Sequence, residues 1–228
     1  MENNNLIAVA GLKKLRVAQI LSVIAVILTA VGAIMALSGA VVAGGTAMDS
    51  GAASIGALAT AGAGGLMTIA GLIVALVSFI MELVGLVKIG PAHINYKYAL
   101  YAVLANIALG VVGIFVMGFP VVSAILQAAS PILVFLTVYF VLSATITLLR
   151  EKGDEAAAAK GTTLRTVYLV CTAVDVAGSL IVLVPALAGF ANTATAISAV
   201  VQIVALFMYI GFLGRSIQTL SGTSSAAQ

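Results

Sequence analysis

Long apolar stretches alternate with short polar segments along the 228 residues of the chain. A transmembrane helix needs about 20 consecutive apolar residues to cross the hydrocarbon core of a bilayer. Six stretches have this length, and they cover roughly residues 17–43, 66–87, 98–118, 131–149, 166–187 and 196–214. The pattern therefore predicts an all-α membrane protein with a single six-helix transmembrane bundle over residues 17–214.

The amino-acid composition supports a lipid environment. Hydrophobic residues make up 63% of the chain and charged residues only 7%, whereas soluble domains carry about 25% charged residues. The single cysteine, Cys171, excludes a framework of internal disulfides. We therefore expect the lipid bilayer to be the main partner of this chain.

The basic residues predict the orientation in the membrane. All ten Lys and Arg fall before, between or after the apolar stretches in positions that share one side of the bilayer: Lys13, Lys14, Arg16, Lys88, Lys97, Arg150, Lys152, Lys160, Arg165 and Arg215. On the other side the only charge is Asp49. Basic residues favour the cytoplasmic side, which predicts a multi-pass protein of the cell (plasma or inner) membrane, with residues 1–16 as a cytoplasmic tail and residues 215–228 as a disordered cytoplasmic tail.

The same basic landmarks suggest a repeated organisation. Lys88, Arg150 and Arg215 each follow an even-numbered apolar stretch, at separations of 62 and 65 residues. This spacing is typical of three parallel helical-hairpin repeats, unlike the inverted repeats found in many transporters.

The segments between the apolar stretches predict turns and caps. Residues 44–65 are rich in Gly and Ala and predict a loop, and the segment "PVVSAILQAA" predicts either a second loop or a re-entrant segment. Pro131 suits the first position of the fourth helix, with Ser130 as its cap. On the inner side, Asp154 suits the N-cap of a short helix that Gly161 would end.

Two carboxylates lie inside the apolar stretches. Asp175 is ten residues beyond Arg165, which places it about 15 Å into a core about 30 Å thick. Glu82 is six residues from Lys88, or about 9 Å deep. Ionisable groups at such depth usually face the interior of the bundle or a water-filled cavity and are candidates for function. Asp175 and Glu82 are therefore the candidate proton- or cation-binding residues.

Helical spacing gives Asp175 a polar face. Positions three, four and seven residues away share one side of a helix, and here they hold Tyr168, Cys171, Thr172, Gly178 and Ser179. The opposite side is formed by Val, Leu and Ile, so we expect the polar face to point away from lipid. Ser78 has the same relation to Glu82, and Asn106 and Gln202 are polar residues of other stretches at suitable depth.

Other chemistry has little support. The single histidine, His93, has no second ligand nearby and predicts no metal site. The chain has no Gly-rich phosphate loop after a strand and no basic patch with stacking aromatics. We therefore expect no cofactor, no nucleic-acid binding and no enzymatic activity.

Two hypotheses for the function remain. In the first, the chain is a transporter or channel for a small solute, linked to a proton or a small cation that binds Asp175. In the second, it is a non-transporting accessory or scaffold protein, in which the polar face only holds helices together. A second copy of the chain or another membrane subunit is a candidate partner under either hypothesis.

Overall fold

The computed structural model describes residues 2–45, 51–116, 118–181 and 188–222. These residues form six α-helices in chain order: α1 (Glu2–Gly45), α2 (Gly51–Ile89), α3 (Ile94–Phe115), α4 (Pro120–Glu151), α5 (Glu155–Ile181) and α6 (Ala188–Leu220). Each contains a window long and apolar enough to cross a membrane. The predicted number and order of apolar helices are thus found within the described part of the chain.

The chain divides into two compact units. One consists of Val17–Glu82, and the other of Met1–Arg16 together with Leu83–Gln228. The boundaries fall inside α1 and α2, so the first turns of α1 and the last turns of α2 belong to the larger unit. Each unit is described separately.

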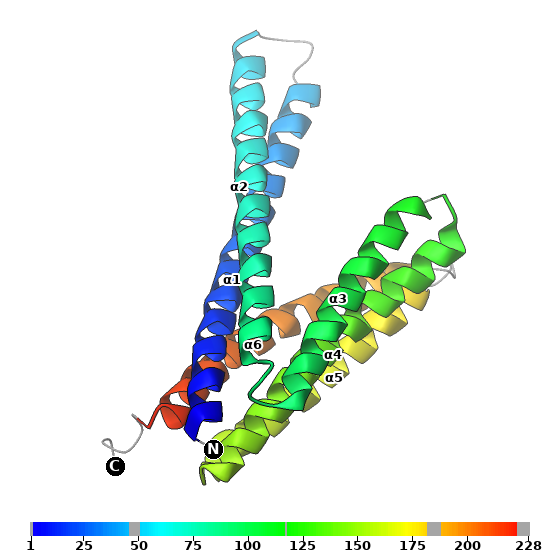
Figure 1. Ribbon diagram of the computed structural model, residues 1–228. Coiled ribbons are helices and arrows are strands. Elements are labelled where there is room, and N and C mark those ends of the chain that lie inside the picture. The colour runs from blue at the N-terminus through cyan, green and yellow to red at the C-terminus, as the bar shows by residue number, and fades with distance from the viewer. Residues whose placement is uncertain (1, 46–50, 117, 182–187, 223–228) are drawn as a thin grey trace. The chain divides into compact units, whose positions relative to one another are not determined.

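The smaller unit is a hairpin of α1 and α2, which lie side by side (Figure 1). Glycines allow the two helices to approach closely. A Cβ atom on Gly64 would lie 2.6 Å from the carbonyl oxygen of Gly32, and one on Gly32 would lie 2.7 Å from the carbonyl oxygen of Gly64. Further along, the Ser78 hydroxyl donates a hydrogen bond of 2.7 Å to the carbonyl of Ala18. Small residues at an interface are the usual means of helix association in membranes.

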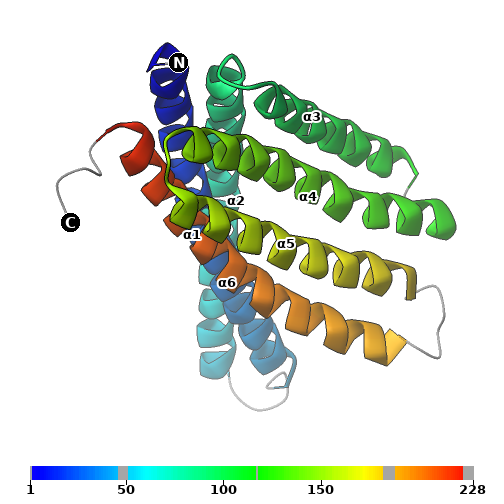
Figure 2. The same cartoon turned by 90° about the horizontal axis from the view of Figure 1, so that it is seen from below.

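In the larger unit, α3, α4, α5 and α6 lie next to one another in chain order (Figure 2). The first turns of α1 and the last turns of α2 also pack together, because a Cβ on Gly11 would lie 2.5 Å from the Cβ of Ile89. Gly214 of α6 lies against the guanidinium of Arg16, whose Cζ would be 3.1 Å from an added Cβ.

The buried core of this unit lies toward the helix ends that carry the basic residues. The largest fully buried apolar side chains there are Leu12, Leu15, Leu86, Ile89, Tyr96, Leu142, Leu149, Leu164 and Leu213. Farther from those ends, large apolar side chains are exposed, as with Ile114 and Phe115 on α3 and Val121 on α4. Such a surface is suited to lipid rather than to water.

Both terminal segments are largely helical where the structure describes them. α1 begins at Glu2, so most of the predicted tail 1–16 is helical, because Ala8, Leu12 and Leu15 recur at helical spacing and are buried. α6 continues to Leu220, so the prediction of disorder is wrong for residues 215–220. Gly222, with φ of 75°, follows the end of α6 in the conformation that commonly terminates helices. Residues 223–228 lie outside the described residues.

Two predictions about segments that were expected on the outer side are also wrong. The segment "PVVSAILQAA" is neither a loop nor re-entrant, because it forms the start of α4, with Pro120 rather than Pro131 at the first positions. Pro131 lies inside the helix, and Ser130 donates its hydroxyl to Asn106 Oδ1 of α3 instead of capping α4. Most of the predicted loop 44–65 belongs to α1 or α2, while residues 46–50 lie outside the described part.

The connection between α4 and α5 is short. Asp154 accepts a hydrogen bond of 2.9 Å from the backbone N–H of Ala157, which confirms the predicted N-cap. Gly161, however, does not end the helix, because α5 runs on to Ile181. Gly161 is buried where α5 meets its neighbours, and a Cβ there would lie 2.7 Å from Ile146 and 2.8 Å from Phe212.

Candidate functional site

The contact between α5 and α6 joins two of the polar residues singled out above. Asp175 lies on α5 and Gln202 on α6, and both side chains are half-buried. The Gln202 amide Nε2 donates a hydrogen bond to Asp175 Oδ2. Both residues fall within helix segments that are apolar enough to cross a membrane. The structure therefore provides an interhelical partner for the carboxylate that lies deepest by sequence.

The face of α5 that carries Asp175 is its more buried face. Cys171 and Gly178 are buried, and Tyr168, Thr172 and Ser179 are half-buried. Leu169 and Val170, on the other side, are 52% and 58% exposed. The polar side of α5 thus faces protein, in agreement with the direction that helical spacing predicted.

The two hydroxyls on this face donate within their own helix. Thr172 Oγ1 donates to the carbonyl of Tyr168 and Ser179 Oγ donates to the carbonyl of Asp175, each at 2.9 Å. Their oxygen lone pairs remain able to accept hydrogen bonds. The rings of Tyr168 and Tyr209, with centroids 6.1 Å apart, form a second contact between α5 and α6.

No basic side chain is available within this stretch of the sequence. Between Arg165 and Arg215 the chain contains no Lys, Arg or His, and residues 121–138 of α4, the helix on the other side of α5, contain no ionisable residue. Within these segments of α4, α5 and α6, the groups that can interact with the Asp175 carboxylate are neutral ones such as the Gln202 amide.

The remaining candidates lie on other helices than Asp175 and Gln202. Asn106 accepts from Ser130 at 3.0 Å and thereby links α3 to α4. Ser78 is used in the contact between α2 and α1. Glu82 is half-buried and belongs to the smaller unit, whereas Asp175 belongs to the larger one.

Several polar contacts were not predicted from the sequence. Tyr96 of α3 is buried, and its hydroxyl lies 2.9 Å from Thr145 Oγ1 of α4. The Arg165 guanidinium lies over the ring of Tyr139, 5.2 Å from its centroid. Asp154 also contacts Thr219 and Arg215 of α6. Hydrophobic periodicity describes one helix at a time, so it could not have predicted these contacts between different parts of the chain.

Metal-ligating side chains do not gather in the described part of the chain, where no group of three or more His, Cys, Asp or Glu could hold an ion. The polar face of α5 together with Gln202 offers one carboxylate, one amide and the hydroxyls of Thr172 and Ser179. Such a set is chemically suited to binding a proton or a weakly held cation.

The helices of the described residues are those of a multi-pass membrane protein by length and composition. Comparison with known proteins adds no more specific assignment, because no family model, curated protein or solved structure matches the chain.

Proposed function

We propose that this chain is a cation- or proton-linked transporter or channel in which Asp175 binds and releases the ion. The hydrogen bond from Gln202 to Asp175, which crosses from α6 to α5, is the observation that supports it best. An ionisable group between apolar helices is costly and is usually retained for function.

The chemistry of the partner favours an ion that comes and goes. A glutamine amide has both donor and acceptor groups, so Gln202 can pair with an ionised Asp175 through its N–H and with a protonated one through its carbonyl oxygen. A Lys or Arg at this place would instead hold the carboxylate permanently ionised. The pair is therefore compatible with both states of a binding cycle.

The same proposal includes the location and orientation derived from the charges. The ten basic residues favour a cell membrane location with both termini on the cytoplasmic side. Ions would cross without any chemical conversion, so the chain is proposed not to be an enzyme.

A hydrophobic carbodiimide tests the ion-binding carboxyl, because it modifies protonated carboxyls in apolar surroundings. We expect Asp175 in the full-length protein to be labelled, with protection at high pH or by a specific cation, and Asp175→Asn to lose this label. In proteoliposomes with an imposed membrane potential, ion entry would be followed with a pH-sensitive dye and with radioactive sodium. Asp175→Asn should reduce ion entry to the level of empty vesicles.

Glu82→Gln is the matched control, because it removes the other intramembrane carboxylate. We expect it to keep the Asp175 label and most of the ion flux. The Asp175→Asn protein must elute from gel filtration like the parent, so that lost flux is not mistaken for misfolding. An inert Asp175, together with equal flux through the parent and Asp175→Asn, would refute the proposal.

That result would favour the second candidate, a membrane accessory or scaffold protein. Its specific support is that Ser78 and Asn106 both make helix–helix hydrogen bonds, as residues with a purely packing role do. Under this alternative Asp175 and Gln202 would only join α5 to α6, and Asp175→Asn would preserve all cellular functions of the parent.

A further inference from the structure

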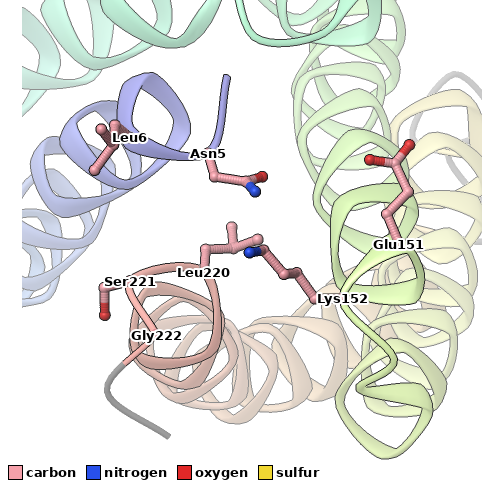
Figure 3. Close-up of a pocket in the computed structure, with 7 residues that line it drawn as sticks. All are labelled: Asn5, Leu6, Glu151, Lys152, Leu220, Ser221 and Gly222. Carbon is pink, nitrogen blue, oxygen red and sulfur yellow. The ribbon is translucent and has the colours of Figure 1, made fainter. Parts of the chain in front are cut away.

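A pocket of about 440 Å³ lies in the larger unit, far along the sequence from Asp175. Its walls come from the N-terminal part of α1, the end of α4 and the end of α6 (Figure 3). These are helix ends on the side where the basic residues occur. The pocket is therefore expected near the inner surface of the membrane.

Two of the walls are held together by one carboxylate. Asp154, in the turn after α4, accepts a hydrogen bond of 2.8 Å from Thr219 Oγ1, and its Oδ1 lies 3.4 Å from Arg215 Nη2. Thr219 and Arg215 are in the last turns of α6. The turn that carries Lys152 and the helix end that carries Leu220 are thus fixed relative to each other, which pre-organises the pocket.

The polar side chain that points into this pocket belongs to a buried residue. Asn5 is only 8% exposed. Figure 3 shows this amide directed into the pocket, on the same side as the Lys152 ammonium. An amide in this position can donate its N–H groups to a ligand in the pocket.

The lining indicates what kind of ligand would bind. Asn5 and Lys152 offer N–H donors, and the ammonium adds a positive charge. Glu151 also contributes to the lining, but its carboxylate is turned away from the Lys152 ammonium (Figure 3). Leu6 and Leu220 add apolar surface, and Leu6 is 63% exposed. A phosphate group attached to an acyl chain combines the acceptors and the apolar part that such a lining requires.

We propose that this pocket binds the phosphate of a phospholipid in the inner leaflet. Asn5 and Lys152 donate to the phosphate oxygens, and the acyl chains pass along Leu6. A soluble phosphate would offer the same acceptors without the chains. The proposal does not involve Asp175 and does not depend on whether the chain transports ions.

Lipid binding to the full-length protein in detergent can be measured by native mass spectrometry with added phosphatidylglycerol. We expect one lipid to be retained per chain. Lys152→Ala should weaken its binding about tenfold, as expected for the loss of a charge-assisted hydrogen bond. Asn5→Leu should also weaken it, because it removes the amide that faces the pocket, while its melting temperature without lipid should match that of the parent.

Lys160→Ala is the control, since it removes an equal charge from an exposed residue of α5 outside the pocket lining. We expect its lipid retention to be unchanged. Equal weakening by Lys160→Ala and Lys152→Ala, or none by Lys152→Ala and Asn5→Leu, would overturn the proposal. Displacement of phosphatidylglycerol by millimolar inorganic phosphate, with equal stabilisation of the protein, would overturn the lipid assignment in favour of a soluble ligand.

Discussion

Asp154 connects three parts of the larger unit through one carboxylate. It accepts from the backbone of Ala157 at the start of α5, from the Thr219 hydroxyl and from Arg215 of α6. Partial burial acts to raise the pKa of Asp154, but the hydrogen bonds from Ala157 and Thr219 and the charge of Arg215 outweigh it and hold the pKa below its usual value. The ionised form is therefore the one that stabilises the fold.

The lowered pKa predicts how the stability depends on pH. The contribution of Asp154 is fully present above the unfolded-state pKa of about 3.9 and is lost as the pH falls through the lower folded-state value. At pH 7, Asp154→Ala should reduce the free energy of unfolding by about 1 to 2 kcal/mol, because it removes the N-cap and its partners. Asp154→Asn should cost less, since Asn also caps helices.

The measurement is thermal unfolding in detergent, followed by circular dichroism because the chain contains no tryptophan. The difference between the parent and Asp154→Ala should shrink between pH 5 and pH 3. A difference of the same size at both pH values would contradict a role for the ionised carboxylate.

At the scale of single residues, the sequence could predict a function for a side chain but not its distant partner. The N-cap role of Asp154 depends on its own local sequence, whereas its contacts with Thr219 and Arg215 depend on how α6 packs. The sequence also singled out both Asp175 and Gln202. Their pairing could not be deduced, because hydropathy does not determine how two neighbouring helices are rotated.

At the scale of helices, the α1–α2 hairpin depends on glycines that face backbone atoms. A Cβ on Gly64 would lie 2.6 Å from the carbonyl oxygen of Gly32, and backbone cannot move aside as a flexible side chain can. Gly65, the next residue, has nothing within 4 Å of its added Cβ. Neighbouring glycines of one helix thus have different roles.

These positions predict opposite effects of the same substitution. Gly64→Ala should destabilise the protein by about 1 to 3 kcal/mol, because the helices must separate to accept the methyl group. Gly65→Ala should leave the stability unchanged or raise it by up to about 1 kcal/mol, since alanine favours the helix. Unfolding curves of the two variants and the parent in one detergent make the comparison, and equal effects of both substitutions would contradict the proposed close contact.

The helices also show where hydropathy predicts well and where it does not. Each apolar core was located because about 20 apolar residues are needed to span lipid. The predicted helix ends were misplaced because charged residues and glycines begin in the sequence before the helix itself ends. Lys13, Lys14 and Arg16 precede the first apolar stretch, yet α1 continues through them, because Lys and Arg are good helix formers. Gly64 was assigned to a loop, although it lies within α2.

At the scale of the whole molecule, the basic residues and the exposed apolar side chains occupy different segments of the chain. The apolar side chains that are exposed along the helices, such as Ile114 and Phe115, require lipid. The ten basic residues occupy only alternate connections and the two terminal segments. A bilayer would satisfy both patterns, and the proposed orientation places the basic segments in the cytoplasm.

Cysteine labelling tests this orientation, and the native sequence is convenient because Cys171 is the only cysteine. In a Cys171→Ser background, Glu155→Cys places a thiol at the exposed start of α5, and Asp49→Cys places one on the predicted outer side. A membrane-impermeant maleimide should label Asp49→Cys in intact cells and label Glu155→Cys only after permeabilisation. The reverse pattern would invert the predicted topology and would move the Asn5–Lys152 pocket to the outer leaflet. Labelling of both thiols in intact cells would mean that these two segments share one side, which an odd number of spans between residues 49 and 155 does not allow.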